Sequence, residues 1–166
     1  MRKKNTERIL AIDPGTRNIG FALLDKGQLI HYGVKTIRQI NSPHEKLRDG
    51  RKIILRLIND FEPQMLVVEK TFFANNRNSA LLNVFADEIK AVGKRKGLEV
   101  QCFAANSVRK FICGNGAASK DDVATAMVSR YPELRPFLTS DRRWKERYHR
   151  NMFDALALAI AAERLA

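Results

Sequence analysis

The chain has 166 residues, 45% of them hydrophobic and 29% charged, and 30 lysines and arginines against 18 acidic residues give a net charge of +12. This composition is typical of a globular protein. No apolar run approaches the ~20 residues that span a membrane, and no signal-type segment follows the basic N-terminus, which excludes a membrane-embedded protein. We therefore expect one cytoplasmic domain over residues 1–166, with a flexible basic segment at 1–7. The positive charge favours a polyanionic partner, nucleic acid ahead of an anionic membrane surface.

The predicted elements begin with strands at 8–13, 18–24 and 28–37, whose short connections predict an antiparallel meander. Helices and strands then alternate, and further helices close the chain. These later elements are helix 43–60, strand 64–68, helix 77–96, strand 98–103 and helices 105–112, 119–130 and 150–165. The order predicts an α/β fold with a mixed five-stranded sheet, made of the meander plus two further strands, and helices on both faces.

The two cysteines, Cys102 and Cys113, lie in apolar stretches of sequence without the C-x-x-C spacing of a metal site. We expect both to be reduced core residues, because neither a disulfide framework nor a zinc site is indicated. Any catalytic chemistry must then come from other side chains.

Three carboxylates occupy unusual places in this pattern. Asp13 ends a buried strand where the first hairpin begins, Glu69 follows the apolar strand at 65–68, and Asp154 lies in the first turns of an otherwise apolar helix. Asp13 could merely cap a turn and Asp154 could merely complement the helix dipole. If the strands are neighbours, however, the carboxylates converge and raise each other's pKa. A divalent cation removes that repulsion, and oxygen ligands favour Mg²⁺ or Mn²⁺.

Five ordered motifs identify a family. They are Ile-Asp-Pro-Gly-Thr-Arg at 12–17, Val-Glu-Lys-Thr-Phe-Phe at 68–73, Asn76 with Ser79-Ala80, Gly-Asn-Gly-Ala-Ala-Ser-Lys at 114–120 and Asp-Ala-Leu-Ala at 154–157. In order and spacing they resemble the RuvC family of Holliday-junction resolvases, which have an RNase H-like fold. The resemblance spans residues 8–165, nearly the whole chain.

This resemblance implies a homodimer that binds four-way junction DNA and resolves it by paired symmetric nicks, leaving 5′-phosphate and 3′-hydroxyl ends. It implies two Mg²⁺ ions per site, with Mn²⁺ as a substitute, and metal ligation by Asp13, Glu69 and Asp154. At a fourth ligand position the family usually has aspartate or histidine, and this chain has Asn151, on the same helix face as Asp154. An amide brings no charge, so His149 or Asp141 are nearby candidates to compensate.

The resemblance also implies DNA-contacting residues. Phe72 falls at a position where an aromatic ring lies against junction bases, although it could be a core residue, and stacking tolerates any base sequence. Lys120 falls at a basic position near the scissile phosphate and joins the catalytic set, although it could be a solvated lysine. Further candidates come from the motifs and from a basic-aromatic segment at 142–150, for which a solvated loop is the alternative. They are Phe73, Asn76, Arg77, Ser79, Asn115, Arg142, Arg143, Trp144, Lys145 and Arg147.

Two alternative functions stay open at this point. Asn151 could leave a junction-binding protein without cleavage, or the chain could be another RNase H-like nuclease that acts on RNA–DNA hybrids. The family points to dimerisation through helix 77–96 and to the nucleoid, an organelle or a phage as its setting. The cleavage sequence and any branch-migration partner cannot be read from these residues.

Overall fold

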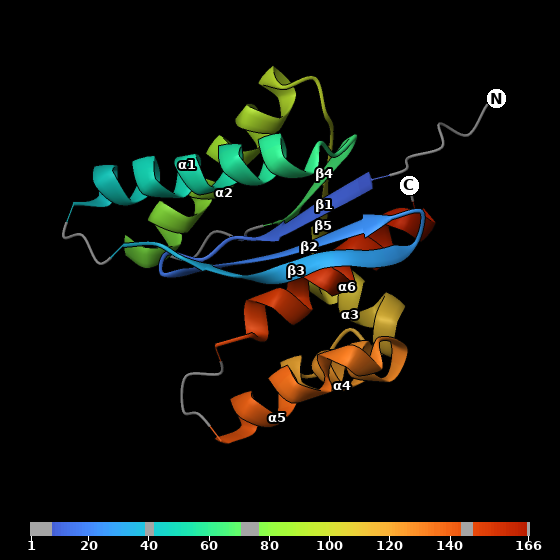
Figure 1. Ribbon diagram of the computed structural model, residues 1–166. Coiled ribbons are helices and arrows are strands. Elements are labelled where there is room, and N and C mark those ends of the chain that lie inside the picture. Colours follow the sequence, from blue (N-terminus) through green and yellow to red (C-terminus); the bar gives the residue numbers. More distant parts are fainter. Residues whose placement is uncertain (1–7, 39–41, 71–76, 144–147, 166) are drawn as a thin grey trace.

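The computed structural model describes residues 8–38, 42–70, 77–143 and 148–165. Within them, five strands form one mixed sheet in the order β3-β2-β1-β4-β5 (Figure 1). Strands β1, β2 and β3 are antiparallel neighbours, and β4 and β5 run parallel to β1. Their bounds are β1 Arg8–Asp13, β2 Asn18–Asp25, β3 Gln28–Thr36, β4 Met65–Lys70 and β5 Glu99–Ala104. The predicted meander and its two further strands are confirmed.

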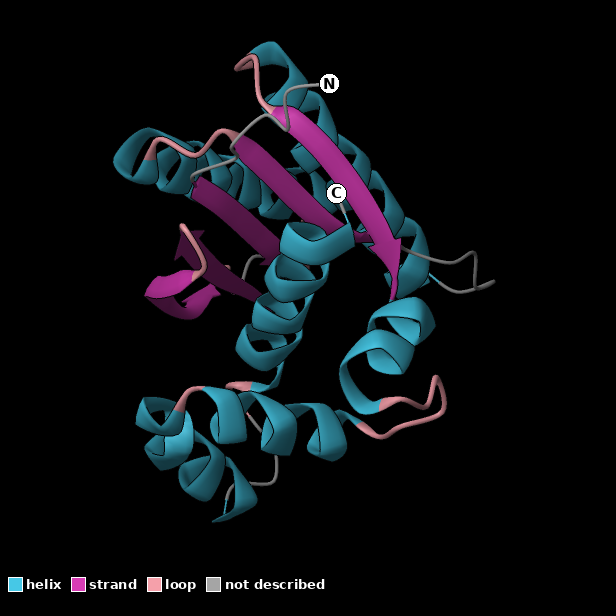
Figure 2. Cartoon of the chain, turned by 90° about the vertical axis from the view of Figure 1, so that its right-hand side faces the viewer, coloured by secondary structure: helices cyan, strands magenta, loops and turns pink. Residues whose placement is uncertain are grey.

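Helices cover both faces of the sheet, as predicted (Figure 1). One face carries α1 (Pro43–Phe61) and α2 (Arg77–Arg95), and the other carries α6 (Arg150–Leu165). Helices α3 (Ala105–Cys113) and α4 (Lys120–Arg130) pack against α6, and α5 (Arg135–Arg143) packs against α4. Figure 2 shows α6 lying across the sheet, with α4 and α5 farther from it. No described helix is long and apolar enough to cross a membrane.

The alternation of side chains along β1 divides the core into two parts. Leu10 and Ile12 pack with the helices α1 and α2, whereas Ile9 and Ala11 pack with α6. The same alternation in β4 puts Met65 and Val67 on the α6 face. The next alternate residue in each strand is a carboxylate, so Asp13 and Glu69 belong to the α6 face. This is the step by which the strand pattern builds the site.

Three details differ from the sequence predictions. Strand β4 continues through Glu69 because β5 pairs with it as far as Ala104, so Glu69 lies within a strand and not after it. Helix α5 and the short 3₁₀ turn Pro132–Leu134 were not predicted, since the α5 sequence is mostly polar. The expectation of two core cysteines is wrong: both thiols are free, but Cys102 is exposed on the edge strand β5 and Cys113 is half-buried.

Candidate active site

The end of β1 and the start of α6 meet at an unusually close contact. Asp13 pairs with Gly20 across the β1–β2 hairpin, and Gly20 lies directly against the α6 backbone. A Cβ at Gly20 would lie 2.1 Å from both the carbonyl carbon and the carbonyl oxygen of Asn151. Only glycine permits this approach. Because Asp154 follows one turn later on α6, the contact brings its carboxylate towards Asp13.

The carboxyl group of Asp13 is buried in the core of the protein. Its exposed fraction is 4%, and among the described residues it is the only buried polar or charged one. Burial raises the pKa of Asp13 well above its ordinary value, and the charges of Glu69 and Asp154 raise it further, while Lys120 opposes them. A carboxylate in such a place needs a counter-charge or a proton.

Glu69 is the immediate partner of Asp13. The charge of Glu69 adds to the effect of burial and raises the pKa of Asp13, so the two carboxyl groups lie close together. Burial and the charge of Asp154 raise the pKa of Glu69, whereas the hydrogen bond from Asp13 lowers it, as do Lys120 and Arg109. The predicted convergence of these two strand residues is therefore present, and it places two acidic groups together where burial disfavours their charge.

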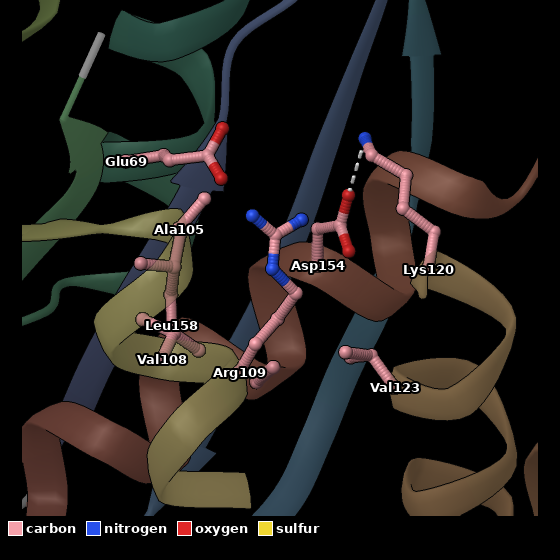
Figure 3. A pocket seen from close by; sticks show the side chains of 9 residues that line it. Glu69, Ala105, Val108, Arg109, Lys120, Val123, Asp154 and Leu158 are labelled. Carbon is pink, nitrogen blue, oxygen red and sulfur yellow. Dashed lines mark hydrogen bonds and ion pairs between the residues drawn. The ribbon is translucent and has the colours of Figure 1, made fainter. Parts of the chain in front are cut away.

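Asp154 and Lys120 form the second part of the site. The Lys120 Nζ donates to Asp154 Oδ2 at 2.8 Å, as drawn in Figure 3. Burial lowers the pKa of Lys120. The negative charges of Asp154, Asp13 and Glu69 together have the larger effect, so the pKa of the lysine is raised. A capping box fixes this lysine at the first position of α4, because Ser119 accepts from the Asp122 backbone and donates its own N–H to the Asp122 carboxylate.

Arg109, on α3, is the site residue that the sequence predictions missed. Figure 3 shows its guanidinium pointing into a pocket between Glu69 and Asp154, with Lys120 on the far side. Its Nε is buried and has no hydrogen-bond partner among the described residues. A signal was present in the sequence, because Arg109 shares the apolar helix stripe of Ala105, Val108 and Ile112. A cation on a core-facing stripe calls for an anionic partner.

The three carboxylates are not arranged around a single point in this structure. In the described part of the chain, no group of three or more His, Cys, Asp or Glu side chains is placed to hold one ion. Asp154 is paired with Lys120, and the Nδ2 of Asn151 donates to the backbone oxygen of Asn18 at 3.0 Å. The ring of His149 packs against Phe137 and Tyr148, at centroid distances of 4.8 Å and 5.0 Å.

Of the other predicted DNA-contacting residues, the structure describes the side chains of only Asn115 and Ser79, and neither lines this pocket. Asn115 is exposed in the connection between α3 and α4, where its Oδ1 accepts from the backbone of Ala117. Ser79 is half-buried in α2. Arg77 begins α2, Arg142 and Arg143 end α5, and Asp141 precedes them, but the structure does not describe these four side chains. The remaining candidates lie outside the described residues, namely segment 1–7, Phe72, Phe73, Asn76, Trp144, Lys145 and Arg147.

Comparison with known proteins gives one consistent family. Residues 9–162 match the model of "Crossover junction endodeoxyribonuclease RuvC". Proteins of that name from Methylobacillus flagellatus and Methylococcus capsulatus are 35% and 34% identical over 129 and 120 residues. The match to the Methylobacillus protein covers 71% of this chain and 71% of the relative. The match to the Methylococcus protein covers 70% of this chain and 72% of the relative. The protein of that name from Myxococcus xanthus is 31% identical over 160 residues, which is 92% of this chain and 78% of the relative.

Solved structures agree on the fold. The structure of Thermus thermophilus RuvC has a TM-score of 0.67 and 24% identity, covering 94% of this chain and 95% of its own. The same bacterium's RuvC in complex with a Holliday junction substrate has a TM-score of 0.70 and 22% identity, covering 93% and 91%. The fold of the chain is therefore that of these RuvC structures. The chain belongs to the crossover junction endodeoxyribonuclease RuvC family.

Proposed function

We propose that the chain is a metal-dependent endonuclease that resolves four-way DNA junctions by paired symmetric nicks with 5′-phosphate and 3′-hydroxyl ends. The observation that carries this proposal is the acidic pair of the buried Asp13 and Glu69, on neighbouring strands, beside the pocket that Lys120 and Arg109 line. Buried carboxylates can bind a divalent cation, and the basic side chains around them can bind the phosphates of DNA.

The donor set fits a divalent metal ion. Asp13, Glu69 and Asp154 would hold it, and their oxygen atoms match the preference of Mg²⁺, with Mn²⁺ as a substitute and two ions per site. When bound, the metal would activate a water molecule and stabilise the leaving oxygen of the phosphodiester. The raised pKa of Asp13 agrees with this assignment, because a bound cation would offset the cost of a buried carboxylate beside Glu69 and Asp154.

The basic residues of the pocket would handle the DNA backbone. Arg109 offers a buried N–H without a partner among the described residues, which suits a phosphate oxygen. Lys120 has 42% of its side chain exposed and therefore reaches both Asp154 and an incoming phosphate. The raised pKa of Lys120 keeps the lysine charged at neutral pH.

The wider DNA surface and the assembly belong to the same proposal. Phe72, Phe73, Asn76, Ser79, Asn115 and the basic residues from 142 to 147 would contact the junction, with Phe72 stacking on bases. Two symmetric nicks require two sites, which a homodimer supplies. Val84 on α2 has an exposed fraction of 52% and supports α2 as the surface that a second copy covers. A nucleoid setting follows from the DNA substrate.

A nicking assay tests the proposal against its alternatives. A synthetic four-way junction, a linear duplex and an RNA–DNA hybrid are each incubated with the protein in Mg²⁺ and in Mn²⁺. We expect paired nicks in the junction alone, and a loss of about a thousandfold in Asp13→Asn and Glu69→Gln, which remove metal ligands. Faster cleavage of the hybrid would contradict the junction assignment. Tight junction binding without product in either metal would favour a binding protein without cleavage.

A further inference from the structure

The side chain of Asn151 is hydrogen-bonded to the β1–β2 hairpin, which carries Asp13. Its Nδ2 donates to the backbone oxygen of Asn18 at 3.0 Å, across 133 positions of sequence and in a partly buried place. Because a carbonyl oxygen only accepts hydrogen bonds, the amide nitrogen and not the amide oxygen must face it. Asn151 therefore joins the first turn of α6 to the start of β2.

The carbonyl of Asn18 depends on this partner because of the hairpin geometry. The neighbouring carbonyl of Arg17 accepts from Ile37 N at 2.8 Å, on the β3 side. Carbonyls alternate along a strand, so that of Asn18 faces the side of β1. Pairing between β1 and β2 ends at Asp13 and Gly20, and no strand residue remains to donate there. Asn151 therefore supplies the hydrogen-bond donor that β1 does not provide for the Asn18 carbonyl.

The surrounding residues are shaped around this hydrogen bond. A Cβ at Gly15 would lie 2.2 Å from the Asn18 oxygen and 3.0 Å from the Asn151 Nδ2. The Asn18 side chain is held as well, since its Oδ1 accepts from the Thr36 hydroxyl at 3.2 Å. The Thr36 hydroxyl also lies 3.3 Å from the Tyr148 hydroxyl. The hairpin turn is thus fixed to α6 and to the residues just before it.

We propose that Asn151 is a positioning residue, whose amide N–H group holds the β1–β2 turn against α6 and so sets Asp13 relative to Asp154. A carboxylate at this position could not donate to the Asn18 carbonyl, so this hydrogen bond depends on the amide N–H group that asparagine supplies. This inference rests on the proposed nuclease function for its catalytic consequence, but the hydrogen bond itself can be tested without activity.

The test compares Asn151→Ala and Asn151→Asp with the wild type, and uses Asn59→Ala as the matched control. Asn59 lies on α1 and accepts an exposed hydrogen bond from Lys96 Nζ at 3.3 Å, away from the pocket. Three quantities are measured: the melting temperature without metal, the maximal rate of junction cleavage, and the Mg²⁺ concentration that gives half of that rate.

We expect Asn151→Ala to lower the metal-free melting temperature by about 2–4 °C, the shift for one lost hydrogen bond in a chain of this size. Its maximal rate should fall about tenfold to a hundredfold because Asp13 is displaced, while the half-saturating Mg²⁺ concentration stays within about twofold since no ligand is lost. Asn151→Asp should be no faster than Asn151→Ala at saturating Mg²⁺. Asn59→Ala should match the wild type in all three.

The opposite results separate the two roles of Asn151. An unchanged melting temperature or an unchanged maximal rate in Asn151→Ala would overturn the proposal. So would an Asn151→Asp variant that is faster than the wild type or reaches half-saturation at lower Mg²⁺, because a ligand would behave in that way. If the wild type does not cleave junctions at all, the nuclease proposal fails, and the metal-free melting temperatures still decide whether the hydrogen bond holds the hairpin.

Discussion

The acidic side of the pocket and its basic side are held by different kinds of structure. Asp13 and Glu69 project from neighbouring central strands, and Asp154 from a helix that is buried along most of its length. Arg109 and Lys120 come instead from short helices around a loop, and 42% of the Lys120 side chain is exposed. The acidic groups are placed by core packing, whereas the basic ones are placed by local helix geometry. Changes to the packing should therefore damage the site more than changes to the basic residues.

Gly20→Ala should have the largest effect, because its Cβ would collide with the α6 backbone. We expect a loss of about 1–3 kcal/mol of stability and of about a hundredfold or more in cleavage rate, since Asp13 and Asp154 would be pushed apart. Thermal unfolding and junction cleavage measure the two effects. Gly33→Ala is the control, because its Cβ would meet only the Phe21 ring, at 3.2 Å. Equal behaviour of the two variants would contradict the close contact with α6.

Arg109→Ala should have a smaller and more selective effect. We expect cleavage to slow about tenfold to a hundredfold, which is the worth of one charge-assisted hydrogen bond to phosphate. Arg109→Lys keeps the charge but not the buried Nε, so it should fall between the alanine variant and the wild type. The stabilisation of the protein by Mg²⁺ should stay intact in both. Cleavage at the wild-type rate in Arg109→Ala would exclude a role for this residue in binding the scissile region.

The pH dependence of stability should show the smallest effect of the three, and it tests the acidic side of the pocket without involving the basic side. Burial raises the pKa of both Asp13 and Glu69 in the folded protein. The folded state therefore binds protons at these two groups more tightly than the unfolded chain does. This contribution is fully present below the unfolded pKa values and is lost as pH rises through the raised folded ones.

Melting curves of the metal-free protein from about pH 8 down to about pH 5 test this expectation. The wild type should gain stability relative to Asp13→Asn as pH falls, since the variant has no acidic proton at that position. Parallel curves for the two proteins would show that the pKa of Asp13 is not raised in the folded protein.

Much of this arrangement could be predicted from the sequence, because it depends on strand alternation and short turns. The apolar runs that end near Asp13 and Glu69 predict the strands, and their shared face follows from the two-residue period. The extension of β4 past Glu69 could not be predicted, since it depends on pairing with β5. Helix α5 was missed because a polar sequence gives no apolar period to recognise.

Two features of the site lay beyond such patterns. The apolar stripe of α3 indicates that Arg109 faces the core, but the groups it meets there depend on where α3 packs relative to β4, which no local spacing encodes. The role of Asn151 depends on a backbone carbonyl near the other end of the chain. A carbonyl has no sequence signature, so family position alone led to the expectation of a metal ligand. The close approach at Gly20 is what turns these distant residues into neighbours.

The claim that the buried acidic pair belongs to a metal centre is tested most directly by melting temperatures with and without Mg²⁺. Binding to the folded state should raise the melting temperature of the wild type progressively with Mg²⁺ concentration. Asp13→Asn should start higher than the wild type without metal at neutral pH, because a buried acid is replaced by a neutral group of similar shape. It should then show no rise with Mg²⁺. A wild type that Mg²⁺ does not stabilise, or equal rises in both proteins, would contradict the account.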